Sequence, residues 1–116
     1  MTLAEIVKSE LDGNLGDYPV RIAGYDRKDV MKQGVILEDD SEDILYTTND
    51  VRIANTQFCN MIVNESNFTR RGTLYDSIET LFKNSSYALT IVGVKIDNRY
   101  SQYGMNYRVR YIGGKV

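Results

Sequence analysis

The chain has 116 residues, the length of one domain, and its 14 Lys or Arg against 16 Asp or Glu give a net charge of −2. It contains no histidine and a single cysteine, Cys59, which excludes His-based catalytic triads, zinc sites built from His or several Cys, and an intramolecular disulfide. With no run near the ~20 apolar residues of a membrane span and no signal-peptide pattern, we expect a chain without membrane contact or cofactor in a reducing compartment.

The charges are distributed unevenly along the chain. Residues 1–50 carry 12 Asp or Glu and 5 Lys or Arg, a balance of −7, whereas residues 51–116 carry 4 and 9, a balance of +5. Such asymmetry indicates a bipolar surface if the fold keeps the two halves apart. If the fold interleaves the halves, the charges mix.

The first predicted element is an amphipathic helix. Thr2 and Glu5 have the spacing of a capping box, and Gly13 and Gly16 end the segment. Its apolar stripe at helical spacing comprises Leu3, Ile6, Val7 and Leu11.

Several extended segments follow. Residues 18–23 alternate with a period of two, and Pro19 indicates an exposed start or a sheet edge. Residues 26–34 form a polar loop, and strands are predicted at residues 35–37, 44–48, 51–54 and 58–64.

A second helix is predicted over residues 68–83, with Asn84 as its C-cap. Gly72 lies inside it at a cost of about 1 kcal/mol against Ala, which predicts a close packing contact. The buried stripe comprises Leu74, Ile78, Leu81 and Phe82.

Two strands close the chain. Residues 88–96 are almost continuously apolar, which predicts a central strand covered on both faces. After a polar loop at residues 97–104, Tyr107 and Val109 alternate with Arg108 and Arg110, as in a half-exposed strand. The element order predicts one α+β domain over residues 1–116, a mainly antiparallel sheet with two helices packed on one face.

No constellation indicates an enzyme. The acidic run lacks the spacing of an EF-hand loop and is better explained as a solvated hairpin tip. Its carboxylates lie in a polar loop, where the burial that tunes a catalytic pKa is not expected. The run comprises Glu38, Asp39, Asp40, Glu42 and Asp43.

The Tyr- and Arg-rich stretch at residues 99–111 is the strongest candidate for recognition. Tyr and Arg are enriched in protein interfaces, and Arg99 and Tyr103 are candidates for such contacts. Residues 103–107 also have a distant likeness to the aromatic strand of an RNA-recognition motif, whose rings stack on bases. A plain surface strand is the third reading.

Parts of the sequence resemble the tail-terminator proteins of tailed bacteriophages. A strand-to-helix step like that of the family is formed by Phe58-Cys59-Asn60-Met61-Ile62-Val63 and then residues 74–81, Leu-Tyr-Asp-Ser-Ile-Glu-Thr-Leu. Residues 97–109 are similar to the closing element of that family. The resemblance covers residues 56–112 and is architectural before them.

The resemblance implies a structural virion protein without catalytic residues. Its copies would form a ring, a hexamer in related tails, that caps the tail tube, ends tube growth and joins the tail to head-completion proteins. Assembly would take place in the bacterial host cytoplasm, with DNA only passing through the lumen. A head–tail connector and a small nucleic-acid-binding domain are the alternatives.

Three expectations about contacts follow. Val30 and Met31, an isolated apolar pair in a charged loop, contact a neighbour or else cover the sheet edge of their own chain. The acidic run faces the lumen, where it would not grip phosphates. Arg108 and Arg110 meet acidic residues of the adjacent subunit.

Overall fold

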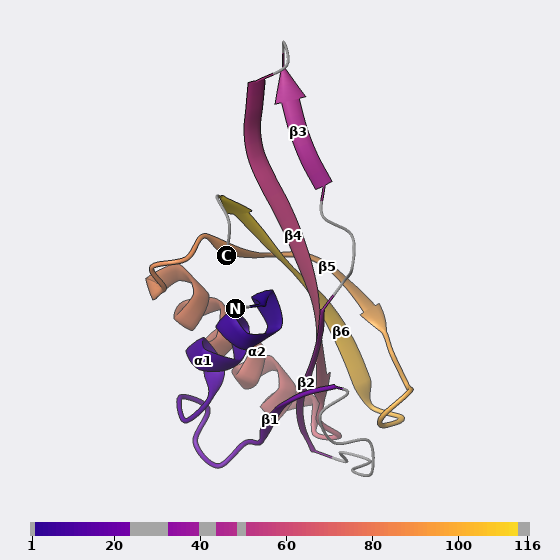
Figure 1. The fold of residues 1–116 in the computed structure, drawn as a ribbon. Coiled ribbons are helices and arrows are strands. Elements are labelled where there is room, and N and C mark those ends of the chain that lie inside the picture. Colours follow the sequence, from indigo (N-terminus) through magenta and orange to yellow (C-terminus); the bar gives the residue numbers. More distant parts are fainter. Residues whose placement is uncertain (1, 24–32, 40–43, 49–50, 114–116) are drawn as a thin grey trace.

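The described residues of the computed structural model, 2–23, 33–39, 44–48 and 51–113, form a six-stranded sheet and two helices (Figure 1). The helices are α1 (Leu3–Leu11) and α2 (Phe68–Asn84). The strands are β1 (Val20–Ile22), β2 (Gly34–Asp39), β3 (Ile44–Thr48), β4 (Val51–Asn64), β5 (Leu89–Ile96) and β6 (Gly104–Gly113). The predicted α+β fold is confirmed.

Strand β4 organises the sheet, whose order is β1-β2-β4-β6-β5. On one side, β3 pairs with residues 51–56 of β4 and β2 pairs with residues 59–64, while β6 pairs with residues 55–64 on the other side. All of these pairs are antiparallel, and only β1 and β2 run parallel. Because β3 lies beyond the end of β2, it forms an arm with the first half of β4 that extends past the helices (Figure 1).

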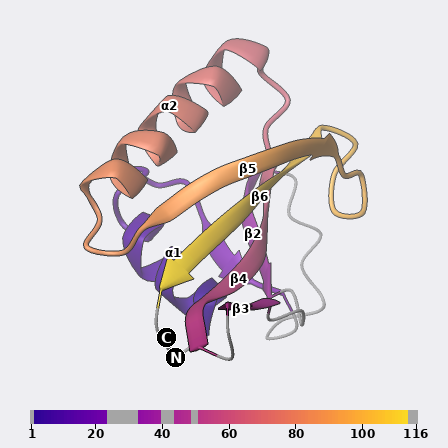
Figure 2. The ribbon, with the colours of Figure 1, turned by 90° about the horizontal axis from the view of Figure 1, so that it is seen from above.

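Both helices pack on the same face of the sheet, as predicted (Figure 2). Thr2 and Glu5 form the expected capping box, which fixes the start of α1. The alternation of β2, β4 and β6 turns every second side chain toward the helices, where the apolar ones are buried. This core comprises Leu3, Val7, Leu11, Val35, Leu37, Cys59, Met61, Val63, Ile78, Phe82 and Val109.

The predictions for α2 hold except at two points. Its N-cap is Asn67, whose side chain accepts from the backbone N–H of Arg70 at 3.0 Å, and Asn84 is the last helical residue rather than the C-cap, which is Ser85. The close packing predicted at Gly72 is wrong, because a Cβ there would meet no atom within 4 Å.

The sheet edges differ from the prediction in one case. Pro19 precedes the edge strand β1, as expected. The central position predicted for residues 88–96 is wrong, since β5 is outermost and most of its side chains are exposed. An apolar run does not reveal how many neighbours a strand has. Among the described strands β5 has β6 as its neighbour, and α2 covers only the part of β5 around Leu89 and Ile91.

The sheet order separates much of the charge. α1, β1, β2 and β3 come from the acidic half of the sequence and lie toward one edge, whereas β5 and β6 come from the basic half and lie at the other. The described elements therefore follow the bipolar reading, with the halves meeting where β2 pairs with β4.

Candidate interaction surface

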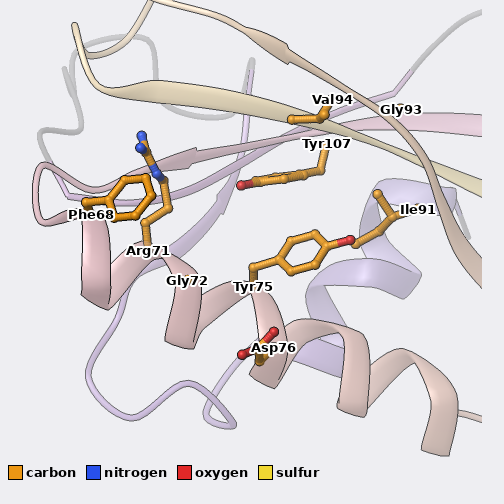
Figure 3. A pocket seen from close by; sticks show the side chains of 9 residues that line it. All are labelled: Phe68, Arg71, Gly72, Tyr75, Asp76, Ile91, Gly93, Val94 and Tyr107. Atoms are coloured by element: carbon orange, nitrogen blue, oxygen red, sulfur yellow. The ribbon is translucent and has the colours of Figure 1, made fainter.

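A groove of about 530 Å³ lies between α2 and β5 (Figure 3). Tyr75 from α2 and Tyr107 from β6 meet inside it, with their ring centroids 5.0 Å apart. Burial raises the pKa of both phenols, and for Tyr75 the carboxylate of Glu79, 3.2 Å from the phenol oxygen, adds to the effect. Both rings are therefore neutral at physiological pH and present largely apolar surface.

Aliphatic and aromatic side chains form the rest of the wall. Ile91 and Val94 contribute from β5, and Phe68 stands at the first turn of α2. The guanidinium of Arg71 lies 5.6 Å from the Phe68 ring centroid (Figure 3). Arg71 also donates to the backbone carbonyl of Tyr103 at 3.4 Å, so it links the groove to the β5–β6 loop.

Two glycines widen this groove. Gly72 lies on α2 and Gly93 on β5, and a Cβ at either position would meet nothing within 4 Å. A glycine inside a helix costs about 1 kcal/mol relative to alanine, and among the described residues no contact requires one at position 72. The space beside the two glycines is open to a side chain from outside.

The groove belongs to a larger apolar surface. All five exposed large apolar side chains of the described residues lie on α2, on β5 or in the loop after it: Phe68 (80% exposed), Val92 (41%), Val94 (60%), Ile96 (76%) and Tyr103 (45%). We call these residues and the groove the β5 surface. Within the described residues β5 pairs only with β6, which leaves one row of its backbone N–H and C=O groups without a strand partner.

On the other face of the sheet, Arg99 is held inside its own chain. Its guanidinium donates to Glu38 at 2.5 Å and to Asp97 at 2.7 Å, and the Tyr100 hydroxyl donates to Glu38 at 2.7 Å. The Arg99 hydrogen bond lowers the pKa of Asp97 although burial acts against it. Burial and the Glu38 contact raise the pKa of Tyr100 to about 12. These contacts pin the β5–β6 loop, and since the Arg99 side chain is 55% exposed, its role as an interface residue stays a prediction.

Arg108 and Arg110 share the face opposite the helices, as their alternation predicted. The guanidinium of Arg108 lies 4.2 Å from the ring centroid of Phe58. The Nε of Arg110 is buried with no hydrogen-bond partner among the described residues.

The hypothesis that the aromatic rings of residues 103–107 stack on bases is wrong for Tyr107, the second of the two rings. Tyr107 points to the helix-covered side, against Tyr75, where it cannot stack on a base across an open sheet face. Tyr111 lies on the same side, with its ring centroid 6.2 Å from that of Tyr87.

The acidic run is only partly a hairpin tip. Glu38 and Asp39 belong to β2, and Asp39 accepts from the backbone N–H of Ala4 at 2.9 Å, at the start of α1. These contacts explain why the two carboxylates are not simply solvated. Asp40, Glu42, Asp43, Val30 and Met31 lie outside the described residues.

Sequence reasoning missed the groove. A usable signal was present, because Gly72 and Gly93 each interrupt an element that would be more stable with a larger residue. Their juxtaposition across α2 and β5 depends on tertiary packing.

Within the described ranges, no three His, Cys, Asp or Glu side chains gather as a metal site would require, and neither helix has the length and apolar character to cross a membrane. The Cys59 thiol is buried, which argues against a reactive thiol at this position. Comparison with protein-family models and with curated proteins found no match.

Proposed function

We propose that the chain is a structural virion protein of the tail-terminator type, whose copies form a ring, a hexamer by the family resemblance. The ring caps the tail tube, ends its growth and receives the head-completion proteins. The observation that carries the proposal is the β5 surface, an apolar edge strand beside an apolar groove.

An exposed apolar sheet edge is a liability for a monomer. Proteins that remain monomeric shield such edges with charge, proline or a covering element, because the open backbone groups pair with other chains. On β5 the side chains of Val94 and Ile96 are exposed, and Lys95 is the only charged residue of the strand. A contiguous apolar surface of this kind marks a protein interface.

The charge distribution favours a ring over a two-fold dimer. A ring uses heterologous contacts, in which one face of a subunit meets a different face of the next. Because the acidic and basic halves lie toward opposite edges of the sheet, head-to-tail contact brings unlike charges together, whereas pairing of two β5 edges brings like charges together.

Two residue assignments are revised. Of the arginines, Arg110 is the better candidate for a neighbour's carboxylate, because Arg108 lies against Phe58. For the acidic lining of the lumen we propose Asp40, Glu42 and Asp43 alone, since Glu38 contacts Arg99 and Asp39 contacts Ala4 within the chain.

Native mass spectrometry and negative-stain imaging test the proposal. We expect closed rings of the wild-type protein, and mainly monomers when Val94→Asp places a charge on the exposed edge. Ser77→Asp, at an exposed position of α2 outside the groove, is the matched control and should assemble normally. A wild-type protein that stays monomeric at tens of micromolar would refute the ring.

The capping role has its own test. Added to polymerising tail-tube protein encoded by the same genome, the wild-type ring should shorten the tubes and occupy one end of each. Val94→Asp should leave tube length unchanged. Rings that bind along tube walls, or not at all, would leave the assembly as a ring but contradict the terminator role.

A further inference from the structure

We infer that strand β3 of one copy pairs antiparallel with strand β5 of the next, so that the sheets continue from subunit to subunit around the ring. This inference rests on the proposed ring and adds which two elements meet. Its partner is a second copy of this chain.

The topology offers β3 as the partner edge. The path β3-β4-β6-β5 has β3 at one end and β5 at the other. The same side of the sheet also carries β1, but β1 has three residues and follows Pro19, which has no N–H to donate. β3 has five residues and, within the described ranges, pairs only with β4.

Strand direction agrees with this pairing. Each neighbour along the path β3-β4-β6-β5 is antiparallel, so β3 and β5 of one copy run in opposite directions. Rotation about the ring axis preserves the sense in which each strand runs relative to that axis. The β3 strand of the next copy would therefore lie antiparallel to β5, which continues the alternation without a break.

The register of the sheet also suits closure. Along β4, β3 occupies residues 51–56 and β6 occupies residues 55–64, so the two strands overlap only at Asn55 and Thr56. A sheet that closes on itself needs strands that are tilted and staggered. Successive copies joined through β3 and β5 would repeat the stagger around the ring.

Charge selects β3 over a second β5. The five residues of β3 carry no charge. The β5 surface carries Lys95 on the strand and Arg71 in the groove wall, with Asp76 as the acidic residue of that wall. Two β5 strands facing each other would bring their lysines toward one another, whereas β3 meets the basic edge without a like charge.

The groove provides room for a side chain of the added strand. Every second residue of a strand on β5 would point to the helix-covered side, toward the space beside Gly72 and Gly93. The β3 sequence, Ile44-Leu45-Tyr46-Thr47-Thr48, contains aliphatic and aromatic residues of a size that fills such a space.

Disulfide trapping between two single-cysteine variants tests the pairing. Val94→Cys is mixed in turn with Leu45→Cys, Tyr46→Cys and Thr47→Cys, which samples both faces of β3 and adjacent registers, and the rings are oxidised after subunit exchange. The native Cys59 can stay because it is buried. We expect at least one mixture to give a covalent heterodimer in a large share of the chains, up to the about one half that random mixing of the two variants allows, since a disulfide requires Cα atoms within about 7 Å.

Two controls accompany the mixtures. Val94→Cys alone reports pairing of two β5 edges and should stay reduced. Ser77→Cys mixed with the three β3 variants reports random collision and should give less than about one tenth of the cross-linked product. A chain with both the productive β3 cysteine and Val94→Cys should give a ladder whose last band equals the subunit number of the ring.

The outcomes separate the two proposals. Intact wild-type and variant rings without a mixed disulfide at any β3 position would overturn the β3–β5 pairing and leave the ring. Cross-linking of Val94→Cys with itself would also overturn it, in favour of a two-fold contact. The absence of any oligomer would overturn the ring and the pairing together.

Discussion

Arg99 and Glu38, 61 positions apart in the sequence, form an ion pair across the sheet face that the helices leave uncovered, with Nη2 and Oε1 2.5 Å apart. The pair joins the β5–β6 loop to β2. Asp97 and Tyr100 complete the cluster through hydrogen bonds to Arg99 and Glu38. By fixing this loop, the cluster also holds the end of β5 and Tyr103 in place on the apolar edge.

The cluster predicts a dependence of stability on acid. The pKa of Asp97 is lowered in the fold, chiefly by the hydrogen bond from Arg99, so its carboxylate stabilises the fold fully above its ordinary pKa of 3.8. That contribution is lost as the pH falls below 3.8 and through the lower pKa of the folded state. Asp97→Asn should lower the free energy of unfolding by only about 1–2 kcal/mol at pH 7, because solvent screens the partly exposed Arg99 and weakens the ion pair.

Thermal unfolding between pH 7 and pH 2.5 measures this effect. The difference in stability between wild type and Asp97→Asn should shrink as the pH falls through the acidic range. An unchanged difference at pH 2.5 would show that the Asp97 charge is not the cause. Ser77→Ala, at an exposed residue of α2 away from the cluster, is the control and should leave the stability nearly unchanged at every pH.

Gly104 and Gly72 make opposite predictions for substitution by alanine. At Gly104 a Cβ would lie 2.0 Å from the backbone oxygen of Asp97 and 2.9 Å from Oδ1 of Asn64, so Gly104→Ala should cost about 1–3 kcal/mol or more. At Gly72 the space is open and the backbone is helical, so Gly72→Ala should stabilise by about 1 kcal/mol. Chemical denaturation of the two variants measures both changes, and a neutral Gly104→Ala would contradict the packing at the loop.

Asp39 should stabilise the start of α1. Its carboxylate accepts from the backbone N–H of Ala4 at 2.9 Å, and negative charge is favourable at a helix N-terminus. Asp39→Ala should cost about 1 kcal/mol, and Asp39→Asn, which keeps an acceptor without the charge, should cost less. Denaturant unfolding followed by circular dichroism measures the two values. Equal stability of wild type and Asp39→Ala would refute the contact.

Arg110 should contribute to subunit contact through its charge. An exposed pair is worth about 0–1 kcal/mol, so Arg110→Glu should weaken each contact by up to about fivefold, with the ring summing the losses. The effect should be largest at low salt, where screening is weakest. Mass photometry at 20 mM and 500 mM salt measures it, with Arg110→Gln as the control that removes charge without reversing it. Ring formation by Arg110→Glu that matches wild type at both salts would exclude this residue.

Local chemistry made much of the fold predictable from the sequence. The capping box of Thr2 and Glu5, the stripe of α2 around Ile78 and the alternation about Val109 depend on residues within one or two turns or strands of each other. The sequence by itself therefore determined where the helices and the final strand lie and which side chains they bury. The α+β class followed from their order.

Tertiary structure alone decided the rest. The apolar run of β5 is compatible with a central or an edge strand, and the difference lies in β5 having β6 as its only neighbour among the described strands. The groove exists because α2 brings Gly72 opposite Gly93, and Arg99 is engaged because β2 places Glu38 within its reach. Periodicity describes one strand at a time, whereas these relationships depend on which distant segments become neighbours when the apolar faces are buried together.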